Sequence, residues 1–175
     1  MFPIVIQMIM DKDKSKNLMS RIREGDKEAH RKFYDIYRDN IFKALYFMTQ
    51  SFYIANEILY RVFEKILYGN FDILDNLNRF VWKMTKDSVS EYAGDYRKTL
   101  TQHKEKEAAA TIDISEQGKA FDEVMWRLGQ KDREIILMHM LFDYTFQEIA
   151  DDIGFSVSKV EKRYYKAIKM FKEKL

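Results

Sequence analysis

Apolar residues recur at steps of three and four along much of the chain, the spacing that places them on one face of a helix. One stripe runs through residues 29–48, and Asp26 stands where the N-cap of that helix would lie. A second stripe runs through residues 58–67 and ends at Gly69, a residue typical of helix C-termini, and a third runs through residues 77–92. Because only short polar segments separate the stripes, we predict a bundle of three helices. The apolar positions of the third helix are Leu77, Phe80, Val81, Met84, Val89 and Tyr92.

The pattern is lost between residues 98 and 119, where threonine, glutamine, lysine, glutamate and alanine predominate. This segment has no apolar stripe to pack, so we predict a linker. Apolar positions return at Phe121, and their spacing predicts four further helices. With six glycines and one proline the chain is poor in turn residues, so we predict an all-α fold of two small helical domains. The predicted boundaries are 1–16 for an N-terminal extension, 17–98 for the first domain, 99–118 for a flexible linker and 119–175 for the second domain.

The most specific local pattern lies in residues 144–168. Thr145 and Glu148 have the spacing of a capping box, which fixes the start of a helix. Gly154 supplies a residue for a left-handed turn, and Ser156 stands where it would cap the next helix. Two short-linked helices with a glycine in the turn are typical of a helix-turn-helix.

The second helix of this pair carries a concentration of basic residues. Such a face is more often only a solvated surface, but the capped helix and glycine turn in front of it favour DNA binding. The total charge of +2 says nothing about this, because it is the distribution of charge that marks a nucleic-acid surface. The residues that we expect on DNA, at an upstream element, are Ser158, Lys159, Lys162, Arg163 and Lys166.

The composition argues against an enzyme. The chain contains no cysteine, which excludes disulfides, thiolate zinc sites and thiol catalysis. Its three histidines, His30, His103 and His139, stand far apart without metal-ligand spacing, and no Walker loop or nucleophile motif is present. We therefore expect no catalytic residues, no metal and no cofactor, and we interpret His139 as a packed, hydrogen-bonded core residue.

Residues 1–10 are apolar, but a helix that spans a bilayer needs roughly twenty residues. The segment also lacks the basic leader and small-residue cleavage site of a secretory signal. We therefore expect a cytoplasmic protein with no membrane partner.

The second predicted domain resembles a known family. Leu128, residues 133–136, the capping box with Gly154, and residues 157–162 are similar to region four of extracytoplasmic-function sigma factors, in the sigma-70 superfamily of RNA polymerase subunits. The Val-x-x-Val-Glu-Lys variant of the second helix is most similar to the sigma factors of Bacteroidota. The resemblance implies that residues 119–175 form the helix-turn-helix that recognises the upstream promoter element.

The first predicted domain is similar to sigma region two, from the opening at residues 23–29 and the aromatic residues Phe33, Tyr34 and Tyr37. The resemblance implies a sigma factor that binds core RNA polymerase, at the clamp coiled coil of its largest subunit and at its flap, and directs promoter recognition and transcription initiation. The residues implied at the clamp are Asn56, Glu57, Tyr60, Arg61 and Glu64. Those implied at the minus-ten region of promoter DNA are Lys83, Lys86, Asp87, Arg97 and Lys98. The loop at residues 69–78 would receive a base flipped from the non-template strand.

The chain departs from the family pattern at functional positions. Arg61 stands where the clamp motif has an acid, and Lys86-Asp87 stands where the third helix has Arg-Asn. Because an acid beside DNA repels phosphate, we hypothesise weak autonomous promoter reading. The further partner that follows from this hypothesis is an accessory DNA-targeting protein such as a nuclease-dead guide-RNA effector. The resemblance also implies an anti-sigma factor as an alternative partner.

Two alternatives remain open. A stand-alone helix-turn-helix transcriptional regulator would bind DNA through the same helices but never polymerase, and its first domain would bind a ligand or dimerise. Most aromatic residues should lie in the core, but Trp82, next to Lys83 on the third helix, is a candidate for a DNA role.

Overall fold

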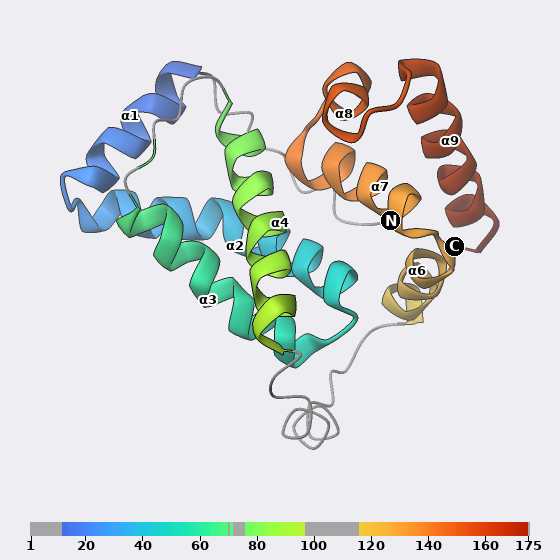
Figure 1. Cartoon of the computed structure of the whole chain (residues 1–175), viewed down its shortest axis with the longest axis horizontal. Helices are drawn as coiled ribbons and strands as arrows, with labels where there is room; N and C mark the ends of the chain where they lie inside the picture. The colour runs from blue at the N-terminus through green and yellow to red at the C-terminus, as the bar shows by residue number, and fades with distance from the viewer. Residues whose placement is uncertain (1–11, 70, 72–75, 97–115, 175) are drawn as a thin grey trace. The chain divides into compact units, whose positions relative to one another are not determined.

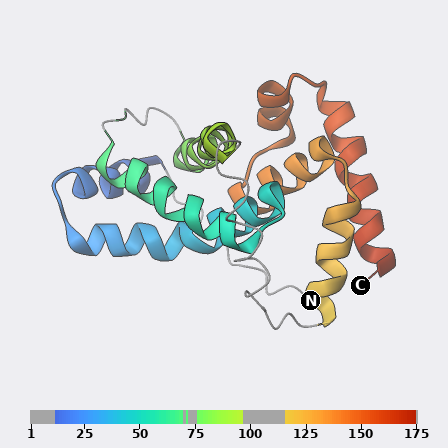
Figure 2. The same ribbon diagram turned by 60° about the horizontal axis from the view of Figure 1, so that its bottom comes forward.

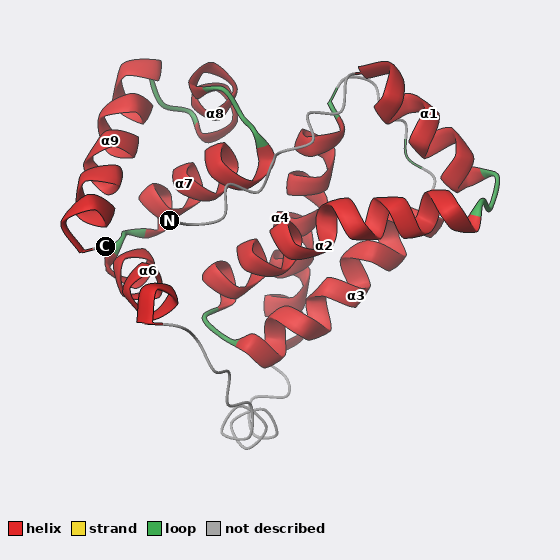
Figure 3. Cartoon of the chain, turned by 180° about the vertical axis from the view of Figure 1, so that it is seen from behind, coloured by secondary structure: helices red, strands yellow, loops and turns green. Residues whose placement is uncertain are grey.

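The computed structural model describes residues 12–69, 71, 76–96 and 116–174, and every regular element in these ranges is a helix (Figure 1). The predicted all-α class is therefore confirmed. The chain divides into two compact units, residues 1–103 and 104–175. Figure 3, coloured by secondary structure, displays the helices of both units. None of the described helices combines the length and the hydropathy that crossing a bilayer requires.

The described residues of the first unit form α1 (Lys12–Arg23), α2 (Lys27–Thr49), α3 (Phe52–Tyr68) and α4 (Leu77–Tyr96). The last three correspond to the predicted bundle, since α2 packs against both α3 and α4, and α3 against α4. Their facing apolar side chains are buried, as the three-and-four spacing predicts. The core residues that no solvent reaches include Phe33, Ile41, Ala44, Leu45, Ala55, Ile58, Val62 and Val81.

Helix α1 was not among the predicted elements. It begins at Lys12, inside the segment predicted as an extension, and buries Leu18, Met19 and Ile22 against α2. Its apolar residues are too few to form a long stripe, so the sequence pattern alone does not predict this helix. Their burial against α2 shows that it belongs to the bundle.

The N-cap predicted at Asp26 is confirmed. Its carboxylate accepts hydrogen bonds from the backbone N–H groups of Glu28 and Ala29, at 2.9 and 3.2 Å. Arg21 donates to the other carboxylate oxygen at 2.7 Å, and Gly25 between them adopts φ 79°. One acid therefore both starts α2 and ties it to α1.

Gly69 ends α3 as predicted, but not by a left-handed turn. Its backbone is extended, with φ −76° and ψ 150°. Glycine is needed there because a Cβ atom would collide with the ring of Phe71 and with the carbonyl oxygen of Lys65. The loop prediction at residues 69–78 falls mostly outside the described residues.

The inward face of α4 differs from the predicted one. Thr85 and Ser88 are buried, whereas Met84 and Val89 are only half-buried. Trp82 is 3% exposed and belongs to the core, so the candidate DNA role for its ring is wrong. Thr85 and Ser88 interrupt the apolar stripe on the buried face. A prediction that uses only hydrophobic positions therefore assigns the wrong residues to the core.

The second unit contains α6 (Glu116–Arg127), α7 (Gln130–Phe142), α8 (Phe146–Ile153) and α9 (Val157–Lys174). Helix α9 packs against the other three, and Figure 2 shows α6 beside it, where the rings of Phe121 and Phe171 stack 4.8 Å apart. The predicted boundaries of the domains stay a prediction, because most of the segment predicted as linker lies outside the described residues.

Arg133 joins α7 to the end of α6. Its Nε donates to the carbonyl oxygen of Met125 and its Nη2 to that of Leu128, both at 3.0 Å. The last carbonyls of a helix lack intrahelical partners, so this guanidinium caps α6. Its burial lowers the pKa of Arg133.

Candidate nucleic-acid interface

The start of α8 has the predicted capping box. Thr145 Oγ1 accepts from the backbone N–H of Glu148 at 3.2 Å, and Glu148 Oε2 accepts from the backbone N–H of Thr145 at 2.9 Å. Two orphan donors at the helix terminus are thereby satisfied reciprocally.

The turn after α8 has the predicted left-handed glycine. Gly154 adopts φ 72° and ψ 35°. Its N–H and that of Phe155 both donate to the carbonyl oxygen of Ala150, at 3.0 and 3.1 Å. Ser156 then accepts at Oγ from the backbone N–H of Lys159 at 3.4 Å. Residues 146–174 therefore form a helix-turn-helix whose geometry is set by local hydrogen bonds.

The side of α9 that faces the unit consists of Val160, Ala167 and Phe171, which are all buried. Val157 and Tyr164, also predicted to point inward, are half-buried, and burial raises the pKa of Tyr164. Because this apolar side packs against the rest of the unit, only the residues on the opposite side of α9 are available to bind a partner.

His139 lies where α7, α8 and α9 meet. Its ring stacks on Phe146 and meets Tyr164 edge-on, with both centroid separations at 4.7 Å. Its Nδ1 lies 2.7 Å from the carbonyl oxygen of Tyr144, so this nitrogen must carry the proton and donate. The interpretation of His139 as packed and hydrogen-bonded is confirmed, although the residue is half-buried and lies at the edge of the core.

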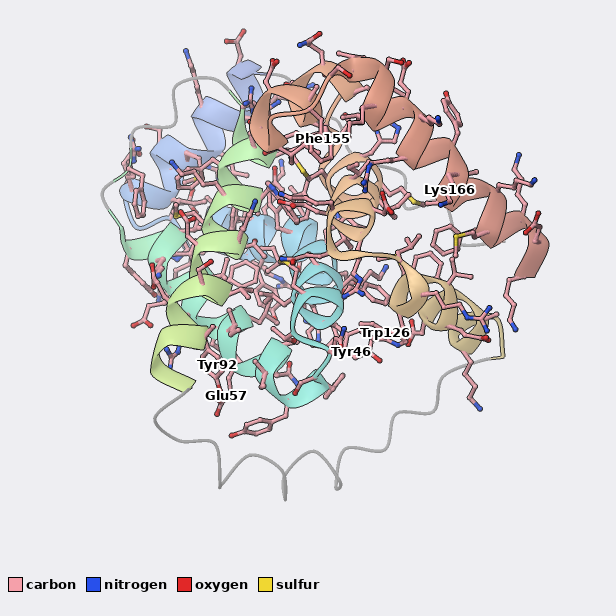
Figure 4. All side chains as sticks on the ribbon, turned by 45° about the vertical axis from the view of Figure 1, so that its right-hand side comes forward. Tyr46, Glu57, Tyr92, Trp126, Phe155 and Lys166 are labelled. Carbon is pink, nitrogen blue, oxygen red and sulfur yellow. The ribbon has the colours of Figure 1, made fainter. Side chains whose placement is uncertain are left out.

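The predicted basic side chains lie together on the outer side of α9. Lys159, Lys162, Arg163 and Lys166 fall within an arc of about 100° on a helix of 3.6 residues per turn. The three lysines and Ser158 are exposed, while Arg163 is half-buried. Figure 4 labels Lys166 on α9 and Phe155 at the turn that precedes it.

The cations of this face differ in their partners. Arg163 Nη1 forms an ion pair with Asp132 Oδ1 at 2.6 Å. Lys159 Nζ lies 3.8 Å from the centroid of the Phe155 ring, and Arg163 Cζ lies 5.4 Å from the same point. Within the described part of the chain, Lys162 and Lys166 take part in no ion pair.

The spacing of apolar and basic residues along the helices does not predict the contacts that Asp132 and Phe155 make. Asp132 is separated from Arg163 by 31 positions, and nothing in a helical pattern links two residues so far apart. Phe155 lies in the turn before α9, so the helical spacing of Lys159 and Arg163 does not extend to it.

In the first unit, the residues predicted at the clamp share one side of α3, but they differ in what they contact. Tyr60 is 71% exposed and Glu64 is exposed, while Asn56 is half-buried. Glu57 accepts hydrogen bonds from the hydroxyl groups of Tyr53, at 2.5 Å, and Tyr92, at 2.8 Å.

Arg61 also turns toward α4. Its Cζ lies 5.2 Å from the centroid of the Tyr92 ring. Burial, and then the hydrogen bond to Glu57, raise the pKa of Tyr92. Glu57 and Tyr92, labelled in Figure 4, therefore join α3 to the second half of α4.

The residues predicted at the minus-ten region are only partly described. Lys83, Lys86 and Asp87 are exposed and share one side of α4 by their spacing of three and four. Arg97 and Lys98 lie outside the described residues.

In the ranges that the structure describes, no cluster of three or more histidine or acidic side chains is arranged to hold a metal ion.

Comparison with known proteins bears on the second unit. No curated protein matches the chain. A protein-family comparison confirms the predicted resemblance to the sigma-70 superfamily in the part that carries the helix-turn-helix. Residues 119–171, from α6 through most of α9, match the family Sigma-70, region 4, and this part of the chain is therefore similar to region 4 of sigma-70.

Proposed function

We propose that this chain is a sigma factor of the extracytoplasmic-function kind, which binds core RNA polymerase and directs promoter recognition and transcription initiation. The observation that carries the proposal is the exposed basic side of α9 behind a capped α8 and a Gly154 turn, within residues that match sigma-70 region 4. An exposed, positively charged helix of this kind fits the major groove.

In the second unit, Lys159, Lys162 and Lys166 neutralise phosphates and hold α9 in register along the groove. Ser158 lies in the first turn of α9, where the helix dipole favours contact with a negative backbone. These residues read the upstream promoter element. The family match and their exposure support this assignment.

In the first unit, α3 docks on the clamp coiled coil of the polymerase's largest subunit through Asn56, Tyr60 and Glu64. A tyrosine that is 71% exposed on a folded helix supports a binding role, because aromatic residues are enriched at protein interfaces. Glu57 and Arg61 contribute from the edge of this face while they also contact Tyr92.

Helix α4 faces the minus-ten region through Lys83 and Lys86. Asp87 stands beside them and repels phosphate, so promoter reading by this unit is weak. We infer that a second DNA-targeting protein, such as a nuclease-dead guide-RNA effector, strengthens placement on DNA. An anti-sigma factor is a further partner that the family resemblance implies.

Two measurements test the proposal. The purified chain is expected to comigrate with core RNA polymerase of its source organism, and the complex is expected to initiate run-off transcription on genomic fragments. Lys162→Ala and Lys166→Ala should weaken initiation at a given template. Lys172→Ala is the matched control, since it removes the same charge from a position about 80° around α9 from Lys162 and about 120° from Lys166.

The outcomes separate the alternatives. Binding to duplex DNA without binding to core polymerase would favour the stand-alone regulator. Robust, sequence-selective initiation without any added factor would exclude the need for recruitment. No affinity for core polymerase, with or without an added DNA-targeting protein, would contradict the sigma-factor proposal itself.

A further inference from the structure

The four cations of the α9 face are not equivalent, and Arg163 differs from the lysines. We propose that Arg163 is a positioning residue, held by Asp132 and Phe155, and that Lys159, Lys162 and Lys166 supply the cationic contacts to DNA. This inference rests on the proposed DNA-binding function of α9.

The ion pair is the first observation. Arg163 Nη1 lies 2.6 Å from Asp132 Oδ1, and the two side chains are 36% and 23% exposed. Asp132 is the acid in the first turn of α7, where the helix dipole stabilises its negative charge. The bond therefore links the N-terminus of α7 to α9 and restrains the rotation of α9 about its own axis.

The presence of Asp132 is itself informative. An uncompensated carboxylate so close to a DNA-binding helix would repel phosphate. Paired with Arg163, the acid is neutralised, but the arginine then contributes no net charge to the face. The net attraction for a phosphate backbone comes from the three lysines, none of which takes part in an ion pair in the described ranges.

Phe155 connects this pair to Lys159. The ammonium of Lys159 lies 3.8 Å from the centroid of the Phe155 ring, and the guanidinium of Arg163 lies beside the same ring at 5.4 Å. Two cations near one ring repel each other, and Asp132 reduces that repulsion because it neutralises Arg163. The pair thereby favours the position of Lys159 at the start of α9, where base edges are read.

The test compares Arg163→Ala, Asp132→Ala, the double variant and Lys162→Ala in the full chain. The probe is a DNA duplex that the wild-type chain selects from a random pool, and its affinity is measured over a range of KCl concentrations, with and without core polymerase. Removal of one cation that touches a phosphate reduces the slope of log affinity against log salt by about 0.9. Lys162→Ala is expected to show this reduction.

Arg163→Ala and Asp132→Ala are both expected to weaken binding by about tenfold with little change in the salt slope. The double variant should be no weaker than either single one, because both substitutions remove the same unit. The charge-reversed pair Asp132→Lys with Arg163→Glu keeps the net charge and should recover much of the affinity. Circular dichroism shows whether each variant folds. If a single variant does not fold, the charge-reversed pair provides the test in its place.

Three results would overturn the inference. Tighter binding by Asp132→Ala, with a slope reduced by about one in Arg163→Ala, would make Arg163 a direct phosphate ligand. Wild-type affinity in all variants of the pair would remove any role for it. A wild-type chain that selects no duplex, alone or with polymerase, would overturn the proposed function together with the inference, and so differs from the first two results.

Discussion

Ser88 holds a buried hydroxyl group that finds no hydrogen-bond partner in the described part of the chain. It is 2% exposed, and an unsatisfied buried polar group costs roughly 1–3 kcal/mol. Ser88→Ala is therefore expected to raise the free energy of unfolding of the first unit by about 1 kcal/mol. Urea denaturation, followed by the fluorescence of the buried Trp82 in a Trp126→Phe background, measures the change.

Thr85 is the matched control for Ser88, since it lies on the same side of α4 but its Oγ1 donates to the carbonyl oxygen of Val81 at 2.7 Å. Thr85→Ala removes a satisfied hydroxyl and a buried methyl group, so it should lower stability by about 1–2 kcal/mol. Equal destabilisation by both substitutions would show that the Ser88 hydroxyl is satisfied after all.

Asp26 makes the first unit sensitive to acid. The hydrogen bond from Arg21, and then that from the backbone of Ala29, lower the pKa of Asp26 below its usual 3.8. A carboxyl with a depressed pKa in the folded state contributes stability that is complete above the unfolded pKa and is lost as the pH falls through the folded one. Stability should therefore decrease below about pH 4, and Asp26→Asn should flatten this dependence. Unfolding midpoints at pH 7, 5 and 3 test it, and equal acid sensitivity in both proteins would contradict it.

At the scale of elements, Tyr92 and Glu57 hold α4 against α3. Tyr92→Phe removes the 2.8 Å hydrogen bond to Glu57 and should cost about 1 kcal/mol of unfolding free energy. Because the pKa of Tyr92 is raised in the fold, its contribution is complete below the usual value of 10.0 and is lost as the pH rises above it. The variant should therefore lose less stability than the wild type above pH 10. Tyr60→Phe, on an exposed tyrosine of the same helix pair, should change neither quantity.

Arg133 is the corresponding link between α6 and α7. Arg133→Lys keeps the charge but replaces the planar guanidinium, whose Nε and Nη2 donate to the carbonyl oxygens of Met125 and Leu128, by a single ammonium nitrogen, so we expect a loss of about 1–3 kcal/mol in the second unit. Trp126 reports on this site, because the guanidinium lies 5.4 Å from the centre of its ring. Arg127→Lys, at an exposed pair with Glu123, is the control and should cost little. A result in which both lysine variants unfold alike would argue against the cap.

A feature could be predicted from the sequence when the residues that form it are close together along the chain. The helix-turn-helix was predictable because Thr145, Glu148, Gly154 and Ser156 make their hydrogen bonds within three or four residues, and such bonds leave a fixed spacing. The Asp26 cap was predictable for the same reason.

Features that depend on tertiary contacts were not predictable. The ion pair of Arg163 joins α9 to α7, and the need for glycine at position 69 arises because the Phe71 ring and the carbonyl oxygen of Lys65 leave no room for a Cβ atom. On α4, the burial of Thr85 and Ser88 depends on the helices around them, because neither side chain is apolar. Only the three-dimensional packing shows these constraints.

At the scale of the whole chain, the small net charge of +2 conceals a division of labour between the units. Exposed lysines recur along α9, whereas the exposed side of α3 carries Tyr60, Arg61 and Glu64 and no exposed lysine. A lysine-rich face attracts phosphate, while an exposed tyrosine gains most from burial against protein. From the proposed function we expect that substitutions on α9 weaken DNA binding alone and that substitutions on α3 weaken polymerase binding alone.

Lys162→Ala with Lys166→Ala should reduce the salt slope of duplex binding by about two and leave the affinity for core polymerase unchanged. Tyr60→Ala should do the reverse, with core binding weakened about tenfold or more and DNA binding by the isolated chain intact, because a truncated interface aromatic commonly costs over 1 kcal/mol. Equilibrium titrations of both variants against duplex DNA and against core polymerase provide all four values. If Tyr60→Ala weakened DNA binding as much as the double lysine variant does, the exposed side of α3 would belong to the DNA surface, and the assignment of the two units would have to be exchanged or merged.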